Sequence, residues 1–186
     1  MKIHGNGQAE PLTKTQFNTV LNNLRGAYRM AFALCWYTTE RPGAILQLDV
    51  EDCYTSGDKR RPRETIVIAR AKRKDRRTRE VPVTVGLAAE LRLYDAPAWG
   101  PLFPSDSRSG HLSYRAYYNA LSRAFAQLGM TGYSPYSTRR GALTHLLKKG
   151  ISTKRIQELS GHASLASLQP YLESSEAEKR RTAELL

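Results

Sequence analysis

Two residues near the carboxyl end of the chain could carry out chemistry on a phosphodiester bond. Tyr171 stands nine residues after His162, which directly follows Gly161. A tyrosine hydroxyl can attack phosphorus and hold the energy of the broken bond as a phosphotyrosine ester. A histidine can donate a hydrogen bond to the same phosphate. These residue types are therefore suited to breaking a nucleic-acid strand without a metal ion.

Such a reaction also needs positive charge and an acid for the leaving group. Arg41 and Arg139 could each grip non-bridging oxygens with a planar guanidinium and stabilise charge in the transition state. Lys74 could protonate the departing sugar oxygen. These side chains stand far apart in the sequence, so a folded domain must bring them together.

The spacing of apolar residues predicts the elements that would position these side chains. In residues 13–24, Phe17, Val20, Leu21 and Leu24 fall on one helical face. Further helices are predicted over residues 27–37, 43–48, 85–94, 113–128, 137–149, 152–160, 164–173 and 175–185. Two β-branched runs, 65–69 and 80–83, predict a hairpin. The expected fold class is α+β, mainly α-helical, with a small antiparallel sheet.

Composition limits the classes of protein that the chain can be. With 186 residues, 40% of them hydrophobic, it has the size of one ordinary domain with its own core. The net charge of +12 favours a polyanionic partner, either nucleic acid or an anionic membrane surface. Cys35 and Cys53 stand in neither a disulfide framework nor a zinc-binding pattern, so a reducing cytoplasm is expected. No apolar stretch has the length of a transmembrane helix.

Most of the net positive charge of the chain lies in one window of the sequence. Residues 59–79 hold eleven basic residues and two acidic ones, for a net charge of +9. A solvated surface normally mixes charges of both signs. This hairpin is therefore expected to bind phosphates, with contacts assigned to Lys72, Arg73, Arg76 and Arg77.

The motifs of the C-terminal half resemble those of the tyrosine recombinase and phage integrase family. The matching runs are Tyr136-Ser137-Thr138-Arg139 and Ile156-Gln157-Glu158-Leu159-Ser160-Gly161-His162, with Tyr171 nine residues on. Upstream, Arg41 stands in the family's Gly-x-Arg-x-x-Glu segment, and Lys74 stands seven residues before Val81 as the hairpin lysine does. The resemblance covers about residues 12–173.

The resemblance implies an integrase-like catalytic domain, with the fold of the DNA breaking-rejoining enzymes. The catalytic residues that it implies are Arg41, Lys74, Tyr136, Arg139, His162 and Tyr171. Tyr171 would be the nucleophile, the two arginines the clamp, Lys74 the acid and His162 a donor. Lys72, two residues from Lys74 on the same predicted strand face, could exchange with it. Arg140 is added to the DNA-binding residues.

Three positions depart from the family pattern. Tyr136 replaces the histidine of His-x-x-Arg, and we expect its hydroxyl to donate to the scissile phosphate instead. Glu40 is taken to replace the glycine before Arg41, and Ala44 replaces the glutamate three residues after it. These departures leave the expected fold unchanged but put full strand-exchange activity in question.

The resemblance also sets the expected domains and partners. Residues 1–11 would be a flexible tail and residues 12–186 the catalytic domain, without the family's N-terminal core-binding domain. Such a chain is either an excised domain or a short family member. Double-stranded DNA, a tetrameric synapse of copies of the chain and an accessory DNA-bending protein are the expected partners, at the nucleoid and without a cofactor. A terminal helix over residues 174–186 would pack on a neighbouring protomer.

Two other functions fit parts of the sequence. Asp49, Glu51 and Asp52 could belong to a metal-dependent nuclease, although one stretch leading into a turn is a weak two-metal site. Residues 152–172 could form a helix-turn-helix in a non-catalytic DNA-binding regulator. The second function leaves Arg41 and Lys74 unexplained.

Overall fold

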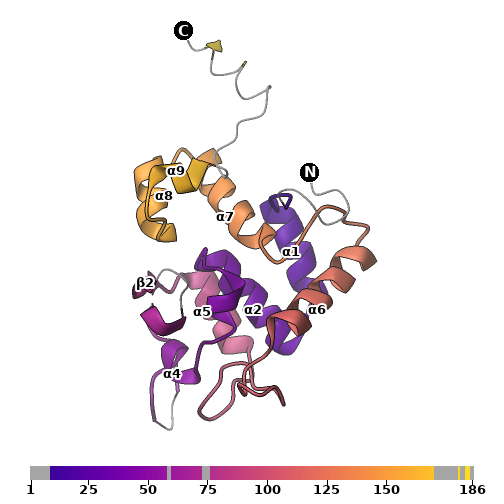
Figure 1. Cartoon of the computed structure of the whole chain (residues 1–186), viewed down its shortest axis with the longest axis vertical. Helices are drawn as coiled ribbons and strands as arrows, with labels where there is room; N and C mark the ends of the chain where they lie inside the picture. The colour runs from indigo at the N-terminus through magenta and orange to yellow at the C-terminus, as the bar shows by residue number, and fades with distance from the viewer. Residues whose placement is uncertain (1–8, 58–59, 73–75, 170–179, 181–182, 185–186) are drawn as a thin grey trace.

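The computed structural model describes residues 9–57, 60–72, 76–169, 180 and 183–184 (Figure 1). Its helices are α1 (Lys14–Asn23), α2 (Gly26–Tyr37), α3 (Pro42–Ile45), α4 (Val50–Cys53), the 3-10 helix η1 (Arg70–Lys72), α5 (Val85–Leu93), α6 (Tyr114–Gln127), α7 (Ser137–Lys148), α8 (Thr153–Ser160) and α9 (Leu165–Leu168). Strands β1 (Thr65–Ile68) and β2 (Arg79–Pro82) form the sheet. The mainly helical α+β fold that the sequence predicts is confirmed.

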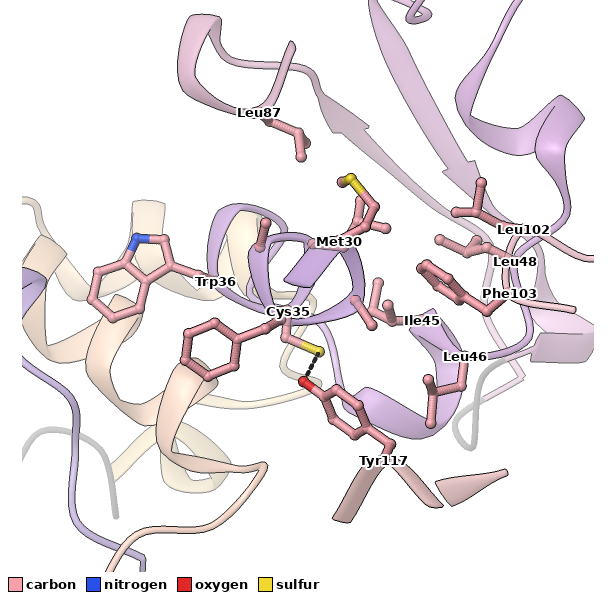
Figure 2. Close-up of a cluster of buried hydrophobic side chains, with 14 of the residues drawn as sticks. Met30, Cys35, Trp36, Ile45, Leu46, Leu48, Leu87, Leu102, Phe103 and Tyr117 are labelled. Atoms are coloured by element: carbon pink, nitrogen blue, oxygen red, sulfur yellow. Dashed lines mark hydrogen bonds between the residues drawn. The ribbon is translucent and has the colours of Figure 1, made fainter. Parts of the chain in front are cut away.

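Helix α2 runs through the centre of the domain, where it contacts α1, α3, α5, α6 and α7. Seven consecutive residues, 30–36, are buried, because a helix that is apolar on all sides must be covered on all sides. Phe17 of α1 stacks on Phe32 and Trp36 of α2, with ring centroids 5.4 and 4.4 Å apart. Figure 2 shows α2 surrounded by side chains from other elements, including Leu87 and Tyr117. The core thus fixes the end of α2, from which the chain enters the candidate site.

The two strands pair antiparallel, with Ile66 opposite Val81 and Ile68 opposite Arg79. Ile66 and Ile68 are buried and Val67 between them is 40% exposed, as the alternation of a half-covered strand requires. Each strand lies within one residue of its predicted position. The prediction that Lys72 continues the first strand is wrong, because the chain turns into η1 after Ile68.

Helix α4 occupies a stretch for which the sequence suggested only a turn. The Asp49 side chain accepts a hydrogen bond from the backbone at Asp52, and Asp52 accepts one from the backbone of Asp49. This reciprocal capping satisfies backbone donors at the start of a helix only four residues long. Two of the three carboxylates of the metal-nuclease alternative are thus used as helix caps.

Residues 9–12 are packed against the rest of the domain. Ala9 is buried, and the backbone N–H of Glu10 donates to the carbonyl of Gly132 at 3.0 Å. The N–H of Leu12 donates to the carbonyl of Ser137 at 3.3 Å. For residues 9–11 the expected flexible tail is therefore wrong, and residues 1–8 lie outside the described residues.

Helices α7, α8 and α9 lie at one end of the domain (Figure 1), around a small cluster formed by Leu143, Ile156 and Leu168. Gly141 of α7 lies so close to its neighbours that a Cβ there would overlap the backbone of Leu12 and the ring of Trp36. The helix predicted over residues 164–173 is seen as α9, and its last residues lie outside the described part, as does most of the helix predicted over 175–185. None of the described helices has the length and apolarity needed to cross a bilayer.

Candidate active site

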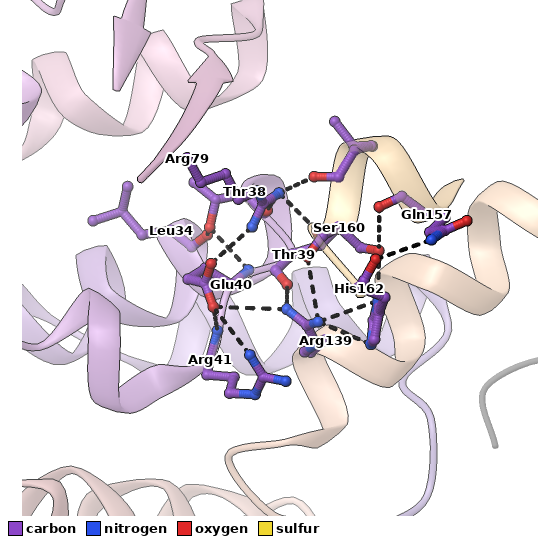
Figure 3. A network of polar contacts seen from close by, with 11 residues as sticks. Leu34, Thr38, Thr39, Glu40, Arg41, Arg79, Arg139, Gln157, Ser160 and His162 are labelled. Carbon is purple, nitrogen blue, oxygen red and sulfur yellow. Dashed lines mark hydrogen bonds and ion pairs between the residues drawn. The ribbon is translucent and has the colours of Figure 1, made fainter. Parts of the chain in front are cut away.

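Arg139 on α7 is fully buried and contacts three segments of the chain (Figure 3). Its guanidinium donates to the carbonyl of Thr39, to the carbonyl of Ser160 at 3.3 Å and to Nε2 of His162 at 2.9 Å. The end of α2, helix α7 and the end of α8 therefore meet at this side chain. The sequence separates these partners by 100 and 21 residues, so only the fold could bring them together.

His162 is placed beside Arg139 by the end of α8. Gly161 caps that helix in the left-handed region, with φ of 66°, and turns the chain back toward α7. The Arg139 guanidinium lies 2.9 Å from Nε2 and 3.3 Å from Nδ1 of the imidazole, and the Ser160 hydroxyl lies 2.6 Å from Nδ1. Because a guanidinium only donates, the imidazole accepts from Arg139. Burial, followed by the charges of Arg139, Arg41 and Arg79, lowers the pKa of His162 to about 4.

Glu40 lies at the centre of the buried charges and is 1% exposed. Its Oε2 accepts from Arg79 at 3.0 Å, and its Oε1 accepts from the backbone N–H of Arg41 at 2.8 Å. The same Oε1 lies 3.8 Å from the Arg139 guanidinium and 4.0 Å from that of Arg41. Figure 3 shows the carboxylate facing all three arginines.

The residue that replaces the family's glycine is Thr39, not Glu40. Thr39 has φ of 54°, in the left-handed region where glycine is favoured, and it stands two residues before Arg41 as Gly-x-Arg requires. The expectation for Glu40 was therefore one residue out of register. Glu40 occupies the variable position of that motif, and its side chain points into the arginine cluster.

Arg79 is a site residue that sequence reasoning missed, because it was counted among the exposed charges of the hairpin. It stands on the buried face of β2, in alternation with Val81, and is 6% exposed. Besides Glu40, its guanidinium contacts the carbonyls of Thr38 and Leu159 and the hydroxyl of Thr39. The alternation of β2 was the signal that could have identified it.

An open cavity of about 460 Å³ lies in front of this buried cluster. It is lined by Glu40, Arg41, Gly43, Ala44, Gln47, Ala71, Lys72, Arg76 and Tyr136. The Arg41 side chain is 35% exposed and Tyr136 is 43% exposed, so both can reach a bound molecule. Arg139 and His162 are not among the described residues that line the cavity, and they lie behind Glu40.

Lys72 also lines the cavity, but its ammonium is paired with carboxylates of other elements. Nζ lies 2.6 Å from Oδ2 of Asp49 and 2.5 Å from Oδ2 of Asp52. Burial opposes protonation, but the hydrogen bonds that the ammonium donates to the two aspartates outweigh it and raise the pKa of Lys72. The aspartates are thus neutralised by a lysine as well as used as caps, which does not favour a metal-dependent nuclease.

The remaining predicted site residues are distributed as follows. Arg76 and Arg77 are exposed, and Arg140 on α7 is half-buried. Lys74, Arg73 and Tyr171 lie outside the described residues. The helix-turn-helix alternative is not favoured, because the residues at the end of α8 contact Arg139.

The arrangement defines a class of protein: a mainly helical domain that holds arginines and a histidine beside an open basic cavity, suited to phosphodiester chemistry. The chain belongs to the phage integrase family, whose profile matches residues 10–178.

The chain is similar to curated tyrosine recombinases. It is 37% identical to the tyrosine recombinase XerC of Bradyrhizobium diazoefficiens over 105 residues, which are 53% of this chain and 32% of that protein. It is 28% identical to XerD of Rhizobium meliloti over 176 residues, which are 89% of this chain and 52% of that protein. The chain therefore spans from about a third to about half of the length of these relatives.

Solved structures share the fold. The XerA recombinase matches with a TM-score of 0.71 and 19% identity, over 96% of this chain and 66% of the other. The XerH site-specific recombinase bound to its difH substrate matches with a TM-score of 0.65 and 19% identity, over 97% and 55%. At these identities the likeness establishes a shared fold.

Proposed function

We propose that this chain is the catalytic domain of a site-specific DNA recombinase that cuts and rejoins double-stranded DNA through a covalent 3'-phosphotyrosine at Tyr171. The observation that carries this proposal is the convergence of Arg139, His162 and Glu40 behind the cavity that Arg41 and Tyr136 line. Membership in the phage integrase family supports the same reaction.

In the proposed reaction, the Tyr171 hydroxyl loses its proton to water, its oxygen attacks the scissile phosphorus, and the bond from phosphorus to the 5' oxygen of the next nucleotide breaks. Arg41 grips a non-bridging oxygen in the cavity, and Tyr136 donates a hydrogen bond to the same phosphate. Arg139 contributes positive charge from the buried cluster, and His162 adds a polar group beside it. The reverse attack by a 5' hydroxyl on the phosphotyrosine rejoins the strand and frees Tyr171.

The leaving-group acid is assigned to Lys74 rather than Lys72. The ammonium of Lys72 is held by Asp49 and Asp52, so donation from Lys72 would first require both hydrogen bonds to break. Lys74 stands at the position that the family pattern gives to its hairpin lysine. A proton from Lys74 to the 5' oxygen completes the first step.

We further propose that the basic segment 59–79 follows the DNA backbone, with Arg73, Arg76, Arg77 and Arg140 on phosphates. Related recombinases have been solved on DNA, among them XerH in a pre-cleavage complex with difH. A tetrameric synapse, an accessory DNA-bending protein and residence at the nucleoid complete the proposal. The segment 174–186 would join neighbouring protomers in that assembly.

A suicide substrate tests the reaction. Nicked target DNA incubated with the protein in a chelator should yield an adduct that survives denaturant. Tyr171→Phe should abolish the adduct, whereas Tyr118→Phe, on the exposed face of α6, should form it at the parental rate. An adduct that survives Tyr171→Phe, or that disappears when metal is chelated, would contradict the assignment.

A further inference from the structure

The carboxylate that the family motif places three residues after its first arginine is absent from this chain. Ala44 stands there, and its side chain lines the cavity without a charge. Of the described residues that line the cavity, Glu40 alone carries a carboxylate. A negative charge is thus present at the site, but it comes from the residue before Arg41.

We propose that Glu40 is the positioning residue of the arginine clamp, and that it substitutes for the missing glutamate at position 44. The proposal rests on the proposed function and adds a residue that neither the family motif nor the expected site contained.

Each oxygen of Glu40 accepts a hydrogen bond from a different arginine. Oε1 accepts from the backbone of Arg41 at 2.8 Å, which fixes where that side chain leaves the α2–α3 connection. Oε2 accepts from the guanidinium of Arg79 at 3.0 Å. The backbone N–H of Glu40 itself donates to the hydroxyl of Thr38 at 3.1 Å. The carboxylate is therefore held in place by its own turn as well as by the arginines.

The Glu40 carboxylate also allows the buried guanidiniums of Arg79 and Arg139 to lie close together. Arg79 and Arg139 both contact Thr39, and they contact the adjacent carbonyls of Leu159 and Ser160 at the end of α8. Two cations this close repel each other unless an anion lies between them. Glu40 bonds one of them and lies 3.8 Å from the other, so its charge keeps Arg139 oriented toward His162.

Glu40→Gln separates a positioning role of the carboxylate from an effect on DNA binding. The rate of adduct formation and the affinity for DNA should change in opposite directions. The amide keeps the shape and loses the charge, so Arg139 and Arg41 should be held less firmly, and adduct formation on a suicide substrate should slow by up to about 100-fold. Loss of the anion also leaves the cavity more positive. Affinity for the same DNA should therefore rise roughly threefold, the effect of one unit charge about 6 Å away in water.

A second variant restores the charge at the position of the family glutamate. Glu40→Gln combined with Ala44→Glu should recover part of the cleavage rate and return the DNA affinity toward the parental value, because position 44 faces the same cavity. Glu51→Gln is the control, since it removes one exposed negative charge outside this cluster and should leave the cleavage rate unchanged.

Four results would overturn the proposal. Faster cleavage by Glu40→Gln would mean that the carboxylate competes with the phosphate. Loss of cleavage and DNA affinity together, without recovery by Ala44→Glu, would mean a purely structural role. The absence of an adduct with the parental chain would overturn the proposed function, and this role with it, whereas an intact parental adduct with an unchanged Glu40→Gln rate overturns the positioning role alone.

Discussion

The buried cluster and the rim of the cavity both contain arginines, but they differ in how far their side chains are exposed to solvent. In the cluster, Glu40, Arg79, Arg139 and His162 are each at most 8% exposed, and their side chains contact one another. On the rim, Arg41 and Tyr136 keep 35% and 43% of their surface in solvent. Burial fixes geometry, because a buried charge cannot leave its partners. Exposure leaves the rim groups available for a substrate, so the two regions should respond differently to substitution.

The largest difference is expected in stability. Arg139→Met removes a buried cation and leaves Glu40 with fewer partners, so the free energy of unfolding should fall by about 3–5 kcal/mol. Arg41→Met removes a half-exposed guanidinium and should change it by less than about 0.5 kcal/mol. Urea unfolding followed by circular dichroism measures both. An equal loss of unfolding free energy in the two variants would contradict the expected difference between the buried cluster and the rim.

The pH dependence of stability should depend on His162. Its imidazole has a pKa of about 4 in the folded protein, lowered by burial and by the nearby arginines from the ordinary 6.5. Between these values the unfolded chain binds more protons than the folded one, so stability should fall as the pH drops from about 6.5 toward 4. Unfolding midpoints at several pH values measure the slope.

His145 is the matched control for this effect. Burial and the neighbouring Lys149 also lower its pKa, but it is only half-buried on α7. His162→Gln should remove most of the slope between pH 6.5 and 4, and His145→Gln should remove little of it. A slope that His162→Gln leaves intact would mean that the imidazole is protonated without unfolding.

A smaller effect is expected on the rim, where Tyr136→Phe keeps the ring and removes only the hydroxyl. If that hydroxyl donates to the phosphate, cleavage of a suicide substrate should slow by about 10- to 100-fold, at or below the range for a lost oxyanion donor, because the site is open to water. Unfolding should change by less than about 0.5 kcal/mol. Cleavage at the parental rate would show that the hydroxyl does not touch the phosphate.

The smallest effect distinguishes two cations that line the same cavity. Arg76 is exposed, so Arg76→Met should lower the slope of log affinity against log salt by about 0.9 for each phosphate that the side chain no longer neutralises. Lys72 is neutralised by Asp49 and Asp52, so Lys72→Met should leave that slope unchanged. DNA titrations at several salt concentrations measure both slopes. A lower slope for Lys72→Met would mean that DNA displaces the aspartates.

Local patterns in the sequence were enough to predict most elements, but not which charges meet. The periodicity of residues 13–24 identified α1, because this signal lies within one or two turns of the helix. Helix α4 was missed because four residues have no period, and its Asp49–Asp52 capping resembled a turn. The motifs that resemble the family pattern singled out Arg139 and His162, and the structure places these two side chains in contact.

The buried role of Arg79 and Glu40 could not be predicted in the same way. Arg79 was one of eleven basic residues in its window, and nothing in that composition separates a buried arginine from a solvated one. Glu40 was regarded as a departure from the motif, and its partners, Arg79 and Arg139, stand 39 and 99 residues away in the sequence. Pairings over such distances are set by the packing of α2, β2 and α7.

The hydrogen bond from Leu12 to Ser137 has a mechanical consequence. It joins the first packed residues to the first turn of α7, two residues before Arg139, and the close approach at Gly141 leaves no slack between the same two segments. A pulling force applied to the chain before Leu12 would therefore be transmitted through these contacts to α7, the helix that carries Arg139. Tension on the N-terminal side would be felt at the site as a displacement of its arginine.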